Sequence, residues 1–358
     1  MASSNQGRAA HESPLRNRQW LLKQRPVGAL RLENFEFREQ VMPEPELSPG
    51  QVLVRNLVFS CAPTMRNWMN DAKHSYRTPV ALGEPISGPA CAQVVKSAHP
   101  RFAVGALVIG VSSWQDYSIL EPDNTPVPIF TVSSDVAPTD ALGIYGLNSL
   151  TAYFGLLRIG KPKPGETLVV SAAAGSVGSM VVQLGKLYGC RVIGIAGGRA
   201  KCEWLKNTCG IAAIDYKTTE LTTGLGKRLA RLAPNGIDVF FDNVGGAMLQ
   251  TVTEQMAVHG RIVLCGQVSA YDSDQPAPGP RDMMLLVYRR LLMQGFVLGD
   301  FVDEITTARN ELTKWVTAGK IRRRDDVRTG FVGLPTAFLD LFSGKNTGSL
   351  LVKIANAT

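Results

Sequence analysis

The sequence predicts an α/β fold in which a doubly wound parallel sheet follows a mainly β region. From about residue 137, strand-like apolar runs alternate with helix-like runs, as in TLVVS (167–171) followed by MVVQLGKLYG (180–189). Strands that alternate with helices at this spacing are typical of βαβ units with a parallel sheet. Before that point, β-forming runs such as QVLVRNLVFS (51–60) lie between proline and glycine breaks, which indicates a β-rich region.

The elements of the second region follow one another in a regular series. A helix over 137–157 opens the series, and a sixth strand is expected at 293–299. The last segment, 334–354, has the pattern of a helix and then a strand, and we expect this strand to rejoin the first region. Between the first helix and the sixth strand, the predicted strands are 167–171, 191–196, 212–216, 237–244 and 260–266, and the predicted helices are 180–189, 200–209, 225–233 and 246–256.

The chain is long enough for two domains with a substantial core, because it has 358 residues of which 45% are apolar. No apolar stretch reaches the length that spans a bilayer. The first residues, MASSNQGRAAHESPLRNRQW, lack the hydrophobic core of a signal peptide. We therefore expect a mobile polar tail over 1–15 and a cytoplasmic location.

The net charge of +8 raises the question of nucleic-acid binding. The basic residues are scattered, however, and the densest run, Arg322-Arg323-Arg324, is followed at once by Asp325-Asp326. We interpret this run as a solvated surface whose charges compensate one another, and we expect no nucleic-acid partner. Mild basicity also suits an enzyme that holds an anionic cofactor.

The cysteines and histidines do not form a metal-binding pattern. The six cysteines contain no C-x-x-C pair, and the four histidines are isolated from every cysteine cluster. Structural zinc requires closely spaced thiolates, and catalytic zinc usually requires histidine. We therefore expect no metal site.

The stretch AAAGSVG (172–178) predicts a dinucleotide-binding turn, because it lies between a strand and a helix at the head of the series. Such a turn needs small residues for its tight bend, for close approach of the backbone to a pyrophosphate, and for packing of the helix on the strand. Ala173, Gly175 and Gly178 can fill these positions in turn. Ser176 and Val177 complete the turn, where the helix offers its first N–H groups to an anion.

The end of the next strand favours NADP over NAD. An NAD site usually has Asp or Glu there to bind the ribose hydroxyls, whereas this strand is followed by Gly197-Gly198-Arg199-Ala200-Lys201. A pair of cations at this point suits a 2′-phosphate, although ordinary charge at the start of a helix is the alternative interpretation. The sequence therefore predicts NADPH as the cofactor.

From Arg16 to the C-terminus, the sequence resembles the zinc-independent medium-chain dehydrogenases/reductases, in the branch of the alkenal/one, prostaglandin/leukotriene and curcumin reductases. The resemblance implies a GroES-like catalytic domain over 16–136 and 313–358, and a Rossmann NADPH-binding domain over 137–312. Substrate and nicotinamide would meet in the cleft between these domains. The resemblance rests on RNRQWLLKQRP, SSWQDY, LTAYFGLLRIGKPKPGETLVV, AGG-x-x-KC, GIDVFFDNVGG, CGQVSAYD and GKNTGSLLVKI.

The resemblance also assigns expected roles to individual residues. Lys201 and Tyr216 would approach the adenosine 2′-phosphate, with Arg199 as a further cation. Asn243 and Asn346 match positions that lie near the cofactor in relatives. A structural aromatic at the end of a strand is the alternative for Tyr216.

The family reaction is the reduction of a C=C bond conjugated to a carbonyl. Hydride from the nicotinamide attacks the β-carbon, so negative charge develops on the carbonyl oxygen and needs a donor placed in advance. The matching position is Tyr271, whose phenol donates a hydrogen bond while it stays neutral near pH 7. Solvent could then protonate the enolate, and no metal is needed. The alternative for Tyr271 is a loop aromatic that packs on PAPGP.

Two departures from the family pattern concern the expected substrate pocket. Relatives usually have D-P-Y-M-R where this chain has APTMR with Thr64, and M-P-G where it has Leu147-Asn148-Ser149. Thr64 and Asn148 would enlarge or repolarise the pocket, which favours an unusual biosynthetic intermediate as substrate. Drift at positions that do not contact the substrate is equally compatible with these changes, and an NADP-binding protein with little turnover is a further alternative.

We also expect a homodimer. The strand at 293–299 would lie at the end of the parallel sheet, where an exposed edge needs to be covered. Pairing with the same strand of a second copy across a two-fold axis would cover it, as it does in relatives.

Overall fold

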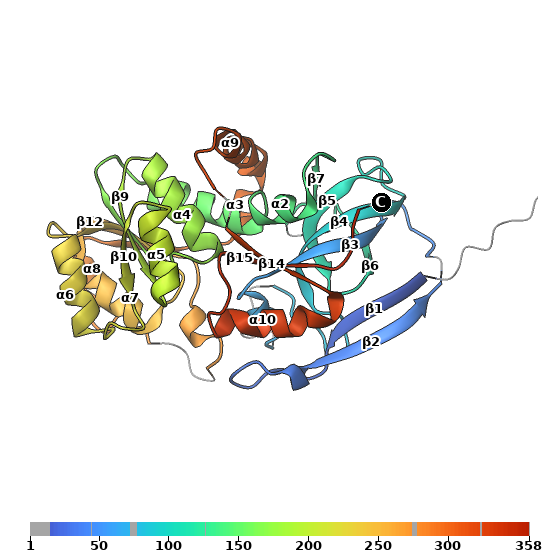
Figure 1. The fold of residues 1–358 in the computed structure, drawn as a ribbon, viewed down its shortest axis with the longest axis horizontal. Coiled ribbons are helices and arrows are strands. Elements are labelled where there is room, and N and C mark those ends of the chain that lie inside the picture. The colour runs from blue at the N-terminus through green and yellow to red at the C-terminus, as the bar shows by residue number, and fades with distance from the viewer. Residues whose placement is uncertain are drawn as a thin grey trace, which may run out of the picture.

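The computed structural model describes residues 15–43, 45–71, 77–125, 127–273, 278–322 and 324–357. These residues form a β-rich lobe built from both ends of the chain and an α/β lobe built from its middle (Figure 1). The predicted fold class is therefore confirmed. The predicted N-terminal tail lies outside the described residues, apart from Leu15 at the start of the first strand.

The α/β lobe contains a six-stranded parallel sheet with the order β10-β9-β8-β11-β12-β13. The strand order reverses between β8 and β11, and sheets of this kind bind ligands at the carboxyl ends of the strands beside such a switch point. The strands are β8 (Thr167–Val170), β9 (Arg191–Ala196), β10 (Ala212–Asp215), β11 (Ile237–Asp242), β12 (Met256–Leu264) and β13 (Leu292–Gly295).

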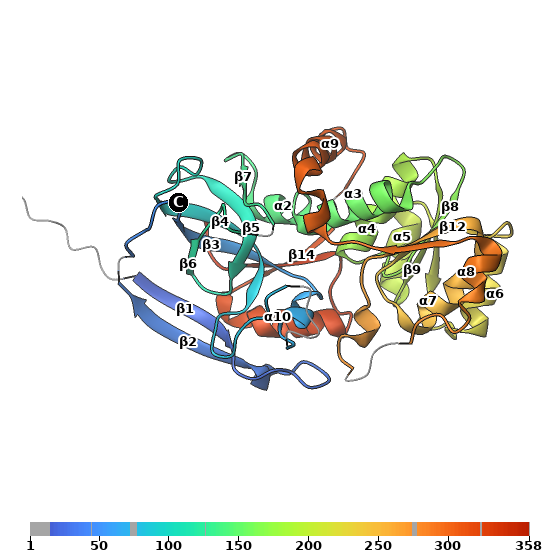
Figure 2. The ribbon, with the colours of Figure 1, turned by 180° about the vertical axis from the view of Figure 1, so that it is seen from behind.

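Both faces of this sheet are buried, because successive strand residues point to opposite sides. Leu168 and Val170 pack in the core beneath α3, α4, α5 and α9, whereas Val169 packs in the core beneath α6 and α7. Helices α6, α7 and α8 lie at the outer end of this lobe (Figure 2). The helices are α3 (Leu147–Phe154), α4 (Ser176–Leu187), α5 (Arg199–Asn207), α6 (Thr223–Leu232), α7 (Gly246–Thr253), α8 (Met284–Arg289) and α9 (Ile305–Thr317).

Two predicted elements differ most from the structure, and β12 begins at Met256, inside the helix predicted at 246–256. The helix predicted at 137–157 is divided into α2 (Pro138–Gly143) and α3, and α3 continues as a π-helix over Gly155–Gly160. The strand predicted at 293–299 ends at Gly295, because the Phe296 side chain packs against the core and a 3₁₀ helix follows at Leu298–Glu304.

The β-rich lobe contains a seven-stranded sheet with the order β14-β15-β3-β4-β5-β7, in which β6 also pairs with β3. Strand β15 lies antiparallel to β3, so the C-terminal strand rejoins the first region as predicted. Strand β14 was not predicted and lies parallel to β15. These strands are β3 (Val52–Cys61), β4 (Ser87–Ser97), β5 (Leu107–Ser113), β6 (Tyr117–Leu120), β7 (Phe130–Val132), β14 (Asp325–Thr329) and β15 (Ser349–Lys353).

The remaining elements complete the two lobes. Helix α2 packs against β3 and β4, and α9 crosses the predicted limit at residue 312, so the exact domain limits stay a prediction. The remaining elements are the strands β1 (Leu15–Leu22) and β2 (Phe35–Met42), the helices α1 (Met65–Trp68) and α10 (Leu334–Phe342), and 3₁₀ helices at Leu32–Asn34, Val268–Ala270 and Phe331–Gly333.

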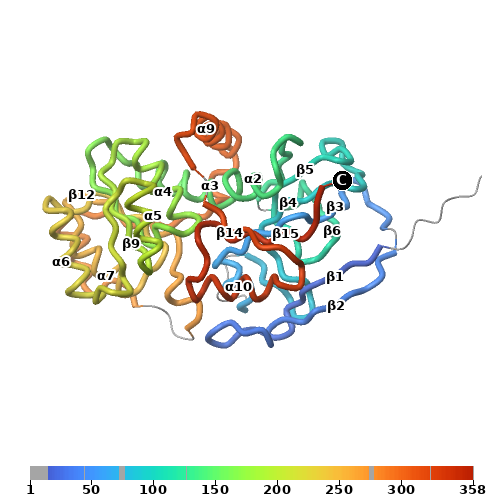
Figure 3. The backbone as a smooth tube through the Cα atoms, in the orientation of Figure 1, coloured from blue at the N-terminus to red at the C-terminus, as the bar shows by residue number. Residues whose placement is uncertain are grey.

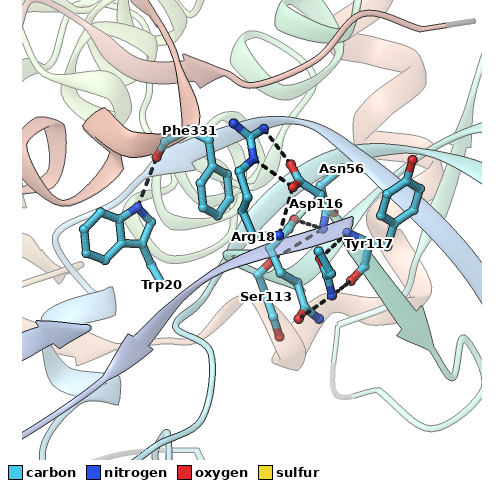
Figure 4. Close-up of polar contacts among 9 residues, drawn as sticks. Arg18, Trp20, Asn56, Ser113, Asp116, Tyr117 and Phe331 are labelled. Carbon is cyan, nitrogen blue, oxygen red and sulfur yellow. Dashed lines mark hydrogen bonds and ion pairs between the residues drawn. The ribbon is translucent and has the colours of Figure 1, made fainter. Parts of the chain in front are cut away.

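A polar network attaches the β1–β2 hairpin to the rest of its lobe (Figure 4). The Arg18 guanidinium donates to both carboxylate oxygens of Asp116 at 2.9 and 2.8 Å. Trp20 Nε1 donates to the Phe331 carbonyl at 3.1 Å, and Asn56 Nδ2 donates to two carbonyls of the segment before β6. The network therefore connects the N-terminal hairpin to the C-terminal segment.

That C-terminal segment returns to the α/β lobe before it enters β15, and Figure 3 shows it in red between the lobes. Gly348 N donates to the Ala174 carbonyl at 3.2 Å, and Ser349 Oγ lies 2.7 Å from Ser176 Oγ. Gly348 has a φ of 70°, and a Cβ atom there would lie 1.8 Å from the Arg324 carbonyl oxygen. Only glycine therefore fits this crossing without displacement of the backbone.

We expect Gly348→Ala to lower the free energy of unfolding by about 1–3 kcal/mol, because the residue has a left-handed backbone and its new Cβ atom would also clash with the Arg324 carbonyl. Urea denaturation followed by circular dichroism measures the change. Gly333→Ala is the matched control, because a Cβ atom at that position would meet nothing within 4 Å and its φ is −77°. Equal stabilities of the two variants would contradict the tight crossing.

Candidate active site

A cavity of about 1370 Å³ lies between the lobes and is lined by residues of both. The loops that follow β8, β9, β11 and β12 all reach it, as expected at the carboxyl edge of a parallel sheet. Of the residues predicted from the sequence, those that line it are Thr64, Asn148, Gly175, Ser176, Val177, Gly178, Gly197, Lys201, Tyr216, Asn243, Tyr271 and Asn346. Ala173 and Arg199 do not line it.

The predicted nucleotide turn connects β8 to α4. Ala173 is buried, and its N–H donates to the Ile195 carbonyl at 3.0 Å, so it attaches the turn to the neighbouring strand. A Cβ atom at Gly178 would lie 2.3 Å from the Ala172 carbonyl oxygen, so the close approach of helix and turn requires glycine there. The N-terminus of α4 thus faces the cavity with the N–H groups of its first turn, which suits an anion.

Lys201 and Tyr216 lie beyond the end of β9, at another part of the same cavity. The Tyr216 ring packs on the backbone of Gly197, where a Cβ atom would come within 2.8 Å of the ring. Lys201 Nζ donates to the Gly344 carbonyl at 2.9 Å. Burial, together with the nearby charges of Arg324 and Lys217, lowers the pKa of Lys201. A half-buried lysine with cationic neighbours is a site that an anion would stabilise.

Arg199 does not line the cavity. Its side chain is 90% exposed and forms an ion pair with Glu203 at 2.6 Å. Arg324, which we interpreted as part of a compensated surface, instead stacks on Trp204, with its guanidinium carbon 4.1 Å from the ring centroid. The sequence offers no local signal for this placement, because it depends on the return of the C-terminal segment.

Asn243 holds together the loops that follow β8 and β11. Its Nδ2 donates to the Ser171 carbonyl at 2.7 Å, and its backbone N–H donates to Ser171 Oγ at 2.8 Å. Ser171 Oγ in turn donates to Asp242, which is 1% exposed and also accepts the N–H of Gly245. Burial raises the pKa of Asp242 despite these hydrogen bonds. This network fixes the two loops at the switch point of the sheet.

Tyr271 lies in the loop after β12, directly behind the 3₁₀ helix Val268–Ala270. Its hydroxyl accepts a long hydrogen bond of 3.4 Å from the backbone N–H of Gln267, and its half-buried side chain lines the cavity. A phenol can both accept and donate a hydrogen bond, and Tyr271 is therefore a candidate donor in the wall of the cavity.

Thr64 and Asn148 have different surroundings. Thr64 precedes α1 in the β-rich lobe and lines the cavity there. Asn148 Nδ2 donates to Ser176 Oγ at 2.9 Å, so its amide supports the nucleotide turn. The amide of Asn346 also has a partner within the protein, because its Nδ2 donates to the Gly348 carbonyl at 3.0 Å.

The wall of the cavity includes two cysteines, Cys61 and Cys265. Burial raises the pKa of each thiol to about 12, so neither is a thiolate near neutral pH. Apolar side chains extend this wall: Trp68, Val111, Leu147, Val268, Phe296 and Leu298. In the part of the chain that the structure describes, no group of three His, Cys, Asp or Glu residues could hold a metal ion. Among those same residues, no helix has the length and apolar character to cross a membrane.

Family models match both lobes. The model described as the N-terminal domain of oxidoreductase matches residues 18–127, and the model described as zinc-binding dehydrogenase matches residues 176–315. The first lies in the β-rich lobe, and the second covers most of the parallel sheet together with the nucleotide turn from Ser176 onward.

Similar proteins match nearly the whole chain. The NADPH-dependent curcumin reductase of Escherichia coli is 38% identical over 95% of this chain and 97% of its own length. The NADP⁺-dependent 2-alkenal reductase of Nicotiana tabacum is 37% identical, over 95% and 98%. The crystal structure of CurA from Vibrio vulnificus in complex with NADPH has a TM-score of 0.86 and 40% identity, over 95% and 99%. The chain therefore belongs to the zinc-independent medium-chain dehydrogenases/reductases, in the branch of the curcumin, alkenal and prostaglandin reductases.

Proposed function

We propose that this protein is an NADPH-dependent reductase of C=C bonds conjugated to a carbonyl group. The observation that carries the proposal is the single cleft that joins a nucleotide turn, a cationic end and a tyrosine hydroxyl. The curcumin and alkenal reductases named above support the same reaction class.

The residues present fit NADPH. The N-terminus of α4, brought close to the turn by Gly178, would hold the pyrophosphate. Lys201 and Tyr216 would hold the adenosine 2′-phosphate, and Asn243 and Asn346 would shape the walls of the cofactor site. When bound, NADPH supplies the hydride.

In the reaction, Tyr271 would donate its phenol proton in a hydrogen bond to the substrate carbonyl oxygen. Negative charge develops on that oxygen as the β-carbon accepts hydride, and a donor placed in advance stabilises it most in a site that excludes water. Trp68, Leu147 and Phe296 supply apolar walls for such a site. The protonated state of Cys61 and Cys265 also limits addition of the electrophilic substrate to these thiols.

We expect Tyr271→Phe to lower kcat by about 100-fold while the affinity for NADPH stays unchanged, because the donor acts on charge that develops in the transition state. Consumption of NADPH with a panel of enals, enones and quinones measures the activity, and fluorescence titration measures cofactor binding. Tyr117→Phe is the control, because Tyr117 lies on β6 and does not line the cavity.

An unchanged kcat in the Tyr271→Phe variant would reject the role of this phenol. A wild-type protein that binds NADPH and consumes none with any member of the panel would favour an NADP-binding protein with little turnover.

We also propose that the protein is a homodimer formed through the β13 edge. No described strand lies beyond β13 in the sheet, and α8 packs beside β12 near this edge. Exposed apolar side chains gather on α8 and β13, which is unusual for a surface that meets only water. They include Met284, Val287, Tyr288 and Leu292. A second copy of the edge would supply the missing strand partner and cover these side chains.

Sedimentation at micromolar concentration should give a dimer for the wild type and a monomer for Val287→Glu, because a carboxylate would be buried without a partner at the interface. Val104→Glu is the control, because Val104 is 66% exposed in the other lobe. A monomeric wild-type protein would overturn the proposed assembly.

A further inference from the structure

Arg324 joins the C-terminal segment to the α/β lobe just before β14. Its carbonyl accepts the N–H of Ser349 at 2.8 Å, so its backbone is fixed beside the start of β15. Its side chain reaches α5, where the guanidinium carbon lies 4.1 Å from the centroid of the Trp204 ring. The planar group is therefore held in one place by an aromatic face.

The charge of Arg324 has no counter-ion among the described residues. Its Nη1 atom is buried and has no hydrogen-bond partner there, and the neighbouring Asp326 pairs with Arg328 instead. Burial lowers the pKa of the Arg324 guanidinium. The side chain of Arg324 is half-buried, and its buried, unsatisfied Nη1 atom is a feature that packing alone does not explain.

The nearest functional group of the same sign is Lys201. Trp204 follows Lys201 by three residues on α5, so the two side chains lie on the same face of the helix, one turn apart. Burial is the main cause of the lowered pKa of Lys201, and the charges of Arg324 and Lys217 lower it further. Three cations thus act on one end of the cleft, where a doubly charged anion would relieve their mutual repulsion.

We infer that Arg324 is a specificity-determining residue that favours NADP(H) over NAD(H), through its charge behind Lys201 at the adenosine 2′-phosphate site. This inference rests on the cofactor site of the proposed function. Arg324 does not line the cleft, so it acts through space on the phosphate and on Lys201 and forms no direct hydrogen bond to the cofactor. The side chain of Arg199 is 90% exposed and pairs with Glu203.

The test measures the binding of cofactor fragments and does not depend on turnover. Isothermal titration calorimetry gives the Kd of the full chain for NADP⁺, NAD⁺, 2′,5′-ADP and 5′-AMP. The variants are Arg324→Met, which keeps a side chain that can pack on Trp204, and Arg324→Lys, which keeps the charge. Arg322→Met is the matched control, because Arg322 is an exposed arginine of the same run.

We expect Arg324→Met to raise the Kd for NADP⁺ and for 2′,5′-ADP by about tenfold, and to leave the Kd for NAD⁺ and for 5′-AMP unchanged. Arg324→Lys should retain most of the preference, Arg322→Met should match the wild type, and added salt should reduce the difference between Arg324→Met and the wild type.

If Arg324→Met weakened the binding of NADP⁺ and of NAD⁺ equally, the role of Arg324 would be purely structural and the inference would be overturned. An unchanged preference of the variant for NADP⁺ over NAD⁺ would overturn it as well. A wild-type protein that binds NADP⁺ and NAD⁺ equally would reject the 2′-phosphate site itself. A preference for NADP⁺ that depends on Arg324, in a protein that reduces no enone, would leave this inference intact and reject only the proposed reaction.

Discussion

The crossing of two backbone segments at Gly348 is the constraint on which the cleft depends. There the segment that leads into β15 donates from Gly348 N to the Ala174 carbonyl, in the turn that precedes α4. Ser176 Oγ accepts from Asn148 and lies 2.7 Å from Ser349 Oγ, so the same turn is attached to α3 and to the other lobe. The surface that would meet the cofactor and the lobe that would hold the substrate are therefore positioned by the same few bonds.

The wall of the cleft is chemically different from one part to another. Lys201 and Lys217 line one end, and the charge of Arg324 acts on Lys201 from behind. Apolar side chains and two thiols that stay protonated form other parts of the wall. In a cleft of low dielectric, cations strengthen the binding of a phosphate, and a neutral phenol is favoured as the donor to a developing oxyanion. Phosphate binding and hydride transfer would thus take place in different parts of one cavity.

The differences between prediction and structure came from contacts between separate segments. The helix at 137–157 is periodic in sequence, yet the backbone is extended at Gly146. Glycine is needed there, because a Cβ atom would lie 2.0 Å from the Leu142 carbonyl oxygen. The apolar run at 293–299 leaves the sheet at Phe296, whose ring packs close to Gly155 in the core. Asn148 lines the cleft as expected, but its amide donates to the nucleotide turn.

The sequence by itself determined the fold class and the position of the nucleotide turn, and it favoured NADPH over NAD. These features depend on residues close together in the chain, such as the small residues between β8 and α4 and the missing carboxylate after β9. The tertiary structure alone decided which cations act on the cleft. Arg199 is near Lys201 in the chain but faces solvent, whereas Arg324 reaches α5 only because the C-terminal segment folds back across the lobes. Local sequence patterns do not predict such a contact, because it forms between segments that pack together only in the folded protein.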